Sequence, residues 1–161
     1  MLVLVGPPGA GKTTVGRLAA DRLRVGFRDT DSDVEQRAGK SIPEVFIDDG
    51  EEAFRKLESE AVAKGLAEHD GVLSLGGGAV LDAGTRELLR HHHVVFLAVG
   101  LSDGVKRVGM SAARPVLQLN PRAQLAQLLA ERLPLYREVA SREVSTDGKT
   151  PEQVLDEVLT P

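Results

Sequence analysis

The sequence predicts an α/β fold in which a parallel sheet is flanked by helices. Short apolar runs alternate along the chain with longer segments of helical periodicity, as in successive strand–helix–strand units. The run at residues 72–75 is almost wholly apolar, which is typical of a strand buried on both faces of a parallel sheet. Residues 6–13 read Gly-Pro-Pro-Gly-Ala-Gly-Lys-Thr and lie between an apolar run and a helical pattern. This strand–loop–helix context is that of a phosphate-binding loop.

The individual elements follow from periodicity, turn residues and capping signals. The expected strands are residues 2–5, 26–31, 72–75, 93–99 and 142–145. The expected helices are residues 12–24, one from residue 32, one from residue 42, 51–69, 83–90, 102–108, 121–131 and one from residue 151. Strands separated by helices pair in parallel through crossover connections, which gives a layered architecture.

Three tetrapeptides carry N-capping signals. They are Ser-Asp-Val-Glu from residue 32, Ser-Ile-Pro-Glu from residue 41 and Thr-Pro-Glu-Gln from residue 150. The first places a helix immediately after Asp31, so that Asp31 lies where a strand meets a helix. In an open parallel sheet this junction faces the bound ligand. Pro134 is expected to kink or interrupt the helix that begins at residue 121.

Composition narrows the class of protein. The 161 residues are 42% hydrophobic and 27% charged, enough for one core, so a single domain over residues 1–161 is expected. The absence of cysteine excludes disulfides, thiolate metal sites and thiol nucleophiles. A net charge of −4 gives no basic face for nucleic acid, and no apolar run suits a signal peptide or a membrane span. A cytoplasmic protein is expected, and a monomer, since no long apolar surface stripe is left over.

The segment at residues 6–13 predicts a nucleoside triphosphate site. Glycines let the backbone curl around a polyphosphate, and the loop N–H groups and the helix N-terminus form an anion site. Lys12 is expected to reach the β- and γ-phosphates, and the hydroxyl of Thr13 to bind Mg²⁺. The nucleotide-binding residues expected here are Gly9, Ala10, Gly11, Lys12, Thr13 and Thr14.

Further motifs follow this loop along the chain. They are Asp29-x-Asp31, Phe54-Arg55-x-x-Glu58, Gly76-Gly77-Gly78, Arg114-Pro115 and Arg132-x-Pro134-x-Tyr136. In this order and at these spacings the sequence resembles shikimate kinase over essentially its whole length. The resemblance implies a three-layer P-loop kinase fold similar to nucleoside monophosphate kinases, with five parallel strands in the order 2-3-1-4-5. It also implies transfer of the ATP γ-phosphoryl group to the 3-hydroxyl of shikimate, giving shikimate 3-phosphate and ADP on the route to chorismate and the aromatic amino acids.

The two acidic residues of the second motif have separate expected roles. The resemblance implies that Asp31 positions, and can deprotonate, the acceptor hydroxyl, and that Asp29 helps to hold Mg²⁺ with Thr13, through water. No acidic residue ends the strand at 72–75, where many P-loop enzymes keep a magnesium ligand, so Asp29 would take that role. The alternative is that both acids merely favour the dipole of the following helix.

Arg55 and Arg132 border apolar helix stripes, where a charge needs a partner or faces a cleft. Their planar guanidinium groups suit a carboxylate, and the resemblance implies that this is the carboxylate of shikimate. The alternative for Arg55 is a surface ion pair with Glu58. The helices at about 32–60 are expected to bind shikimate. The resemblance adds as substrate-binding residues Glu58, the walls Phe46 and Phe54, and the backbone N–H groups of Gly76, Gly77 and Gly78.

Residues 109–120 lack clean periodicity and are expected to form a mobile lid loop. The resemblance implies that this loop closes over the nucleotide and that Arg114 contacts the phosphates, as a catalytic residue beside Lys12 and Asp31. Closure would exclude water, which competes as an acceptor. The resemblance also places Arg107 and Lys149 near adenine, although the family often has arginine where Lys149 aligns.

Two other functions fit part of this pattern. A related small-molecule kinase, for example one that acts on gluconate, would share the phosphate-binding loop but not the two inward arginines. A nucleotide-binding switch without catalytic activity would tolerate loss of Asp31 or Arg114, and the sequence has both. A turnover assay separates these classes.

Overall fold

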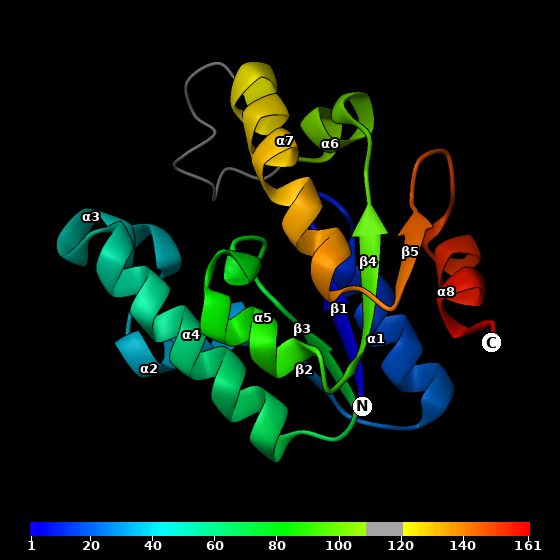
Figure 1. Cartoon of the computed structure of the whole chain (residues 1–161), viewed down its shortest axis with the longest axis horizontal. Coiled ribbons are helices and arrows are strands. Elements are labelled where there is room, and N and C mark those ends of the chain that lie inside the picture. The colour runs from blue at the N-terminus through cyan, green and yellow to red at the C-terminus, as the bar shows by residue number, and fades with distance from the viewer. Residues whose placement is uncertain (109–120) are drawn as a thin grey trace.

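A computed structural model of the chain describes residues 1–108 and 121–161. Its five strands form one parallel sheet in the order β2-β3-β1-β4-β5, which confirms the predicted order. The strands are β1 (Leu2–Val5), β2 (Phe27–Asp29), β3 (Val72–Ser74), β4 (His93–Ala98) and β5 (Arg142–Ser145). Their carboxyl ends meet at one edge of the sheet, toward which the arrows of β4 and β5 point upward in Figure 1.

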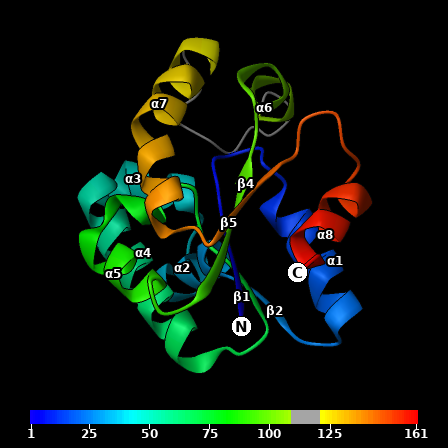
Figure 2. The ribbon, with the colours of Figure 1, turned by 45° about the vertical axis from the view of Figure 1, so that its right-hand side comes forward.

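Helices cover both faces of the sheet and form two outer layers (Figure 2). One face carries α1 (Lys12–Leu23) and α8 (Pro151–Leu159), and the other carries α4 (Glu51–Glu68), α5 (Ala83–Leu89) and α7 (Pro121–Val139). The remaining helical segments are α2 (Thr30–Ala38), α3 (Ile42–Asp49), the 3₁₀ turn η1 (Ala79–Leu81) and α6 (Leu101–Val108). Across the described residues, no helix combines the length and the apolar character that a membrane span requires.

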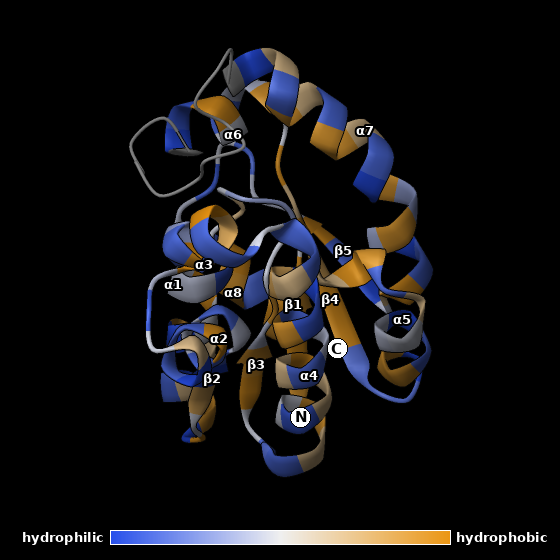
Figure 3. Ribbon diagram, turned by 90° about the vertical axis from the view of Figure 1, so that its left-hand side faces the viewer, coloured by the Kyte–Doolittle hydropathy of each residue, from blue (hydrophilic) through white to orange (hydrophobic). Residues whose placement is uncertain are grey.

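Alternate side chains of the strands enter two separate cores. Leu2 and Leu4 of β1 pack among residues of α1 and α8, whereas Val3 and Val5 pack among residues of α4, α5 and α7. Each of the four is at most 8% exposed, so β1 is buried on both faces, as its unbroken apolar run predicts. Figure 3 shows the hydrophobic strands inside and the hydrophilic outer faces of the helices.

The expected start of the second helix was wrong. α2 begins at Thr30, and its N-cap is Asp29, whose carboxylate accepts a hydrogen bond from the backbone N–H of Asp31 at 2.8 Å. Asp29 has an extended backbone, so the residue that ends β2 also caps α2. Asp31 therefore lies inside the first turn of α2. Glu35 plays no part in the cap, because its carboxylate accepts from the backbone N–H of Ile42 at 3.0 Å.

The other two capping predictions are confirmed. Ser41 caps α3 through the N–H of Glu44, and Thr150 caps α8 in a reciprocal pair with Gln153. These caps satisfy N–H groups that the first turn of a helix leaves without a backbone partner. Both helices consequently start where the sequence places them.

Of the two effects expected of Pro134, a kink or an interruption, the interruption does not occur, since α7 continues from Pro121 to Val139. Proline lacks the N–H that would bond the carbonyl of Ala130, one turn earlier. Both residues are exposed, so water can satisfy that carbonyl on the solvent side. On the opposite side Arg132 and Tyr136 are buried against the protein and keep the helix in place.

Candidate active site

The phosphate-binding loop joins β1 to α1 at the carboxyl edge of the sheet. Gly11 is the N-cap of α1 and has a φ of 87°, in the left-handed region that glycine adopts without strain. The Lys12 ammonium lies over the loop and donates to the carbonyl oxygens of Gly6 at 2.7 Å and Pro7 at 3.0 Å. A cation and a helix N-terminus thus adjoin the same loop, which favours an anionic ligand.

Two oxygen ligands meet at the first turn of α1. The hydroxyl of Thr13 donates to Oδ2 of Asp29 at 3.2 Å, although the residues lie 16 positions apart. Mg²⁺ keeps several waters and takes few protein oxygens beside phosphate, so a hydroxyl and a carboxylate fit its requirements. Within residues 1–108 and 121–161, no group of three or more His, Cys, Asp or Glu side chains could hold a metal. Asp29 caps α2 through Oδ1 and contacts Thr13 through Oδ2, so its two oxygens have different partners.

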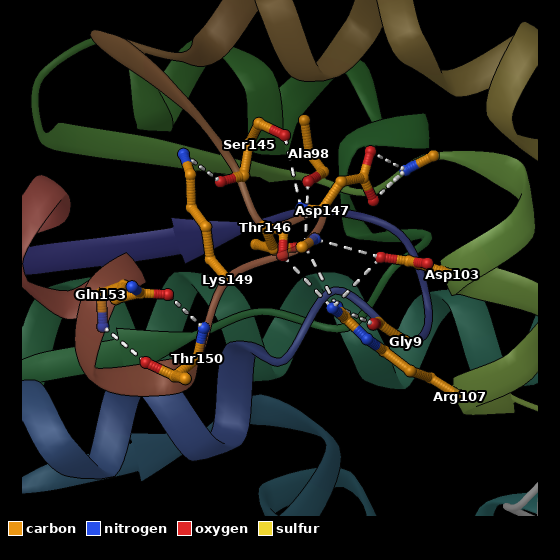
Figure 4. A network of polar contacts seen from close by, with 12 residues as sticks. Gly9, Ala98, Asp103, Arg107, Ser145, Thr146, Asp147, Lys149, Thr150 and Gln153 are labelled. Carbon is orange, nitrogen blue, oxygen red and sulfur yellow. Dashed lines mark hydrogen bonds and ion pairs between the residues drawn. The ribbon is translucent and has the colours of Figure 1, made fainter.

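A cavity of about 330 Å³ opens beside the phosphate-binding loop. Among the residues that line it are Ala10, Gly11, Thr14, Arg107, Lys149 and Pro151. Figure 4 shows Arg107 donating to the carbonyl of Gly9 at 3.0 Å and to the hydroxyl of Thr146 at 3.1 Å. Arg107 therefore ties α6 to the phosphate-binding loop and to the loop after β5. Lys149 also lines the cavity, but its ammonium forms an ion pair with Glu157 of α8 at 2.7 Å.

A second cavity, of about 240 Å³, is lined by residues of α2, α3, α4 and α7, among others. The predicted substrate residues that line it are Asp31, Phe46, Phe54, Arg55, Glu58, Gly77, Gly78 and Arg132. Pro8 of the phosphate-binding loop lines the same cavity, so the two predicted sites adjoin. Gly76 does not line it, and its N–H donates to the hydroxyl of Thr30 at 3.2 Å rather than pointing to a ligand.

Glu58 is a carboxylate buried beside this cavity, with 3% of its surface exposed. Burial raises the pKa of its carboxyl above the usual 4.5, against the opposing effect of the Arg55 guanidinium. Nη1 of Arg55 donates to Glu58 at 2.7 Å, and the two side chains are 26% and 4% exposed, so the pair is partly buried and is not the surface ion pair considered above. A Cβ on Gly76 would lie 2.5 Å from Asp31 Oδ1 and 2.8 Å from Glu58 Oε2. The two carboxylates thus converge on that glycine.

Two guanidinium groups at this cavity have hydrogen-bond donors that no described residue engages. Nε of Arg55 is buried and has no hydrogen-bond partner among residues 1–108 and 121–161, where the Glu51 carboxylate at 3.7 Å is too distant for a hydrogen bond. Arg132 is 8% exposed, and its side chain forms no ion pair or hydrogen bond within the described part of the chain. A buried donor without a hydrogen-bond partner costs free energy unless a ligand supplies one. These donors therefore indicate an anionic ligand.

Aromatic and aliphatic side chains form the apolar part of the cavity. The rings of Phe46 and Phe54 lie 4.7 Å apart between centroids. Sequence reasoning missed Ile42, Leu81 and Leu128, which line the same cavity. Leu128 could have been found, because it precedes Arg132 by one helical turn. The cavity therefore combines apolar walls with guanidinium donors. Arg114 and the predicted lid at 109–120 lie outside the described residues.

Comparisons with known proteins agree on one family. A sequence model described as shikimate kinase matches residues 8–160. Shikimate kinase from Saccharopolyspora erythraea is 61% identical over 158 residues, which cover 98% of this chain and 90% of that protein. Shikimate kinase from Salinispora arenicola is 60% identical over 156 residues, 97% of this chain and 93% of that one.

Solved structures give the same result. Shikimate kinase from Acinetobacter baumannii in complex with shikimate is similar with a TM-score of 0.95 and 38% identity, over 98% of this chain and 89% of that one. Shikimate kinase from Aquifex aeolicus is similar with a TM-score of 0.85 and 32% identity, over 99% of this chain and 94% of that one.

Proposed function

The chain belongs to the shikimate kinase family, and we infer that it transfers the γ-phosphoryl group of ATP to the 3-hydroxyl of shikimate. The products are shikimate 3-phosphate and ADP, in the biosynthesis of chorismate and the aromatic amino acids. The single observation that best supports this reaction is that, among the described residues, the buried Nε of Arg55 has no hydrogen-bond partner and the buried residue Arg132 has no ion pair, in the cavity that Asp31 also lines. Shikimate carries one carboxylate and three hydroxyl groups on a ring, which matches an anion-binding cavity with a nearby acid.

In the proposed complex, Arg132 and the free donors of Arg55 bind the shikimate carboxylate. Guanidinium groups bind carboxylates in planar, often bidentate pairs, which orient the ligand as well as hold it. Glu58 fixes Arg55 through the 2.7 Å contact, and Phe46 and Phe54 contact the ring. A carboxylate held in this way directs the hydroxyl groups toward Asp31 and the phosphate-binding loop.

Asp31 accepts a hydrogen bond from the 3-hydroxyl and takes its proton as the oxygen bonds to the γ-phosphorus. The bond from that phosphorus to the bridging oxygen breaks, and ADP leaves with the electron pair. Lys12 stabilises the charge on the transferring group. Bound Mg²⁺ would neutralise phosphate charge, held by Thr13 and, through water, by Asp29. Arg114 and the loop at 109–120, outside the described residues, are proposed to contact the phosphates and exclude water.

The adenine is proposed to bind in the 330 Å³ cavity, beside Arg107 and the segment that precedes α8. Gly9, Ala10, Gly11 and Thr14 would line the phosphate path, as the loop pattern predicts. Lys149 contributes less to adenine binding than an arginine would, because its ammonium is paired with Glu157. The monomeric state and the cytoplasmic location stay predictions.

A turnover assay of the purified full chain tests this function. With ATP and Mg²⁺, shikimate should stimulate ADP release, and ³¹P NMR should identify a new phosphate ester on the acceptor. Gluconate is the control acceptor, because it carries a carboxylate and hydroxyls without a ring and should give only background release. Equal ADP release with gluconate, or none with shikimate, would refute the assignment.

Substitution of Asp29 by Asn separates metal binding from helix capping. Asparagine caps helices as well as aspartate does, so α2 should keep its stability. It lacks the charge that attracts a hydrated cation, so the Mg²⁺ concentration for half-maximal activity should rise about 10- to 100-fold, the range seen when groups that orient metal ligands are lost. A Mg²⁺ titration and a thermal melt of the free protein measure the two effects. A lower melting temperature with an unchanged Mg²⁺ requirement would assign Asp29 to capping alone.

A further inference from the structure

The backbone turn at 76–78 lies where the phosphate-binding loop meets the substrate cavity. A Cβ on Gly77 would lie 3.1 Å from Cδ of Pro8, which is tight contact with the phosphate-binding loop. A Cβ on Gly78 would overlap the guanidinium group of Arg55. A side chain at either position would have to displace Pro8 or the Arg55 guanidinium, so glycine suits this close approach. A run of glycines can nevertheless adopt many conformations unless other groups hold it.

Hydrogen bonds from three parts of the chain hold successive peptide groups of this turn. The N–H of Gly76 donates to Thr30, and its carbonyl accepts from the N–H of Ala79 at 3.1 Å. The next carbonyl, that of Gly77, accepts from the hydroxyl of Tyr136 at 2.6 Å, in a buried contact between residues 59 positions apart. Each bond fixes the plane of one peptide group.

The Tyr136 bond determines where the N–H of Gly78 points. A peptide group is planar, and in the trans form its C=O and N–H point in opposite directions; the described chain has no cis peptide. Because the Gly77 carbonyl points to Tyr136, the N–H of Gly78 points away from it. Gly77 and Gly78 both line the cavity, and within the described residues this N–H has no acceptor. It is therefore a donor available to a ligand.

Tyr136 is itself held in place. Its ring is 1% exposed and stacks on Phe96 of β4 with centroids 4.9 Å apart. On α7 it follows Arg132 by four residues, so the two side chains share one face of the helix. A single rigid helix thus sets both the guanidinium group that is proposed to bind the carboxylate and the carbonyl that orients the glycine turn.

We propose that Tyr136 is a positioning residue for shikimate. Its hydroxyl orients the peptide group between Gly77 and Gly78 so that the N–H of Gly78 donates to the substrate that Arg132 holds. This role rests on the proposed function, since it requires shikimate in the 240 Å³ cavity. Without the hydroxyl, the Gly77 carbonyl would be buried without its partner, and the glycines would let the turn rotate to recover one.

The test is Tyr136→Phe, which removes one oxygen and keeps the ring. The KM for shikimate should rise roughly 3- to 10-fold, the range that one neutral hydrogen bond contributes. The KM for ATP should not change, and kcat should fall by less than the KM rises, because the lost contact serves binding. Val139→Ala is the matched control, since Val139 lies in the same helix and core, is 5% exposed and does not line the cavity. It should lower stability and leave the KM for shikimate unchanged.

The outcomes distinguish this role from the function on which it rests. If Tyr136→Phe turns over shikimate at the wild-type rate and with the wild-type KM, the positioning role is overturned and the function stays intact. An equal rise in KM in Val139→Ala, or an equal rise for ATP, makes the effect a general loss of structure and also overturns it. No shikimate turnover by the wild type refutes the function, and the role with it.

A measurement on the wild type covers the case in which Tyr136→Phe does not fold. The chain has one tyrosine, so protein labelled with ¹³C at the phenol carbon gives a single tyrosine signal. A hydrogen bond from the N–H of Gly78 to shikimate polarises the same peptide group that accepts from Tyr136. Saturating shikimate should therefore shift this signal, and a signal that does not move overturns the role.

Discussion

Asp31→Asn should lower kcat for shikimate by about 10²- to 10⁴-fold, the range lost with a general base. Asparagine keeps the size of the side chain and can still hydrogen-bond the acceptor hydroxyl, but it cannot take its proton. Asp31 lies in the first turn of α2 and lines the cavity beside Arg55 and Glu58, and Pro8 of the phosphate-binding loop lines the same cavity. The loss should therefore appear in phosphoryl transfer. Steady-state kinetics measures kcat, and calorimetry measures ATP binding, which should stay the same.

Asp33→Asn is the matched control for this substitution. Asp33 lies in the same first turn of α2 and forms an ion pair with Arg28 at 2.7 Å, outside the cavity. An acidic residue in a first turn stabilises a helix by about 0.3–1 kcal/mol, so both variants should lose this small amount, and Asp33→Asn should also lose the charge of its ion pair with Arg28. Asp33→Asn should keep the wild-type kcat. If Asp31→Asn keeps it too, the Asp31 carboxylate only favours the helix dipole and another group orients the acceptor.

The layered fold could be predicted from the sequence because its signals are local and repeated. Apolar runs without alternation mark strands buried on both faces, and α1 and α8 begin at the glycine loop and the capping box that the sequence shows. The predicted start of α2 was wrong because Asp29 both ends β2 and caps α2. The capping pattern that begins at residue 32 follows it in the sequence and is not used. The continuity of α7 depends on Pro134 facing solvent, which only the packed structure determines.

The candidate site was predictable where its residues lie close in sequence. The spacing of Arg55 and Glu58 places them together on one helix, but their burial depends on packing of distant elements around α4. The pairing of Tyr136 with Gly77 joins residues on different elements, and no periodicity connects them. Apolar residues such as Leu81 line the cavity without any feature that distinguishes them from core residues.

The methyl ester of shikimate should lose about 10²- to 10⁴-fold in kcat/KM, from roughly 3–5 kcal/mol of missing charge-assisted hydrogen bonds. The ester keeps the reacting hydroxyl but loses the negative charge. Arg132 would then stay buried without an anion, and Nε of Arg55 without a hydrogen-bond partner. The loss should arise in the binding and orientation of the ring, since the ester leaves the contacts of Lys12 and Asp31 unchanged. Kinetics with the acid and the ester, at the same ATP and Mg²⁺, measures the difference.

Lysine variants of the two arginines show whether this loss arises at the carboxylate. Lysine keeps the charge but not the planar pair of donors, so each variant should lose part of the activity on shikimate and much less on the ester. Arg132→Lys should have the larger effect, because Nη1 of Arg55 is already engaged by Glu58 at 2.7 Å whereas Arg132 has no such ion pair among the described residues. Equal losses on the acid and the ester would mean that neither arginine binds the carboxylate. Equal turnover of the acid and the ester by the wild type would remove the physical basis of shikimate recognition in this cavity.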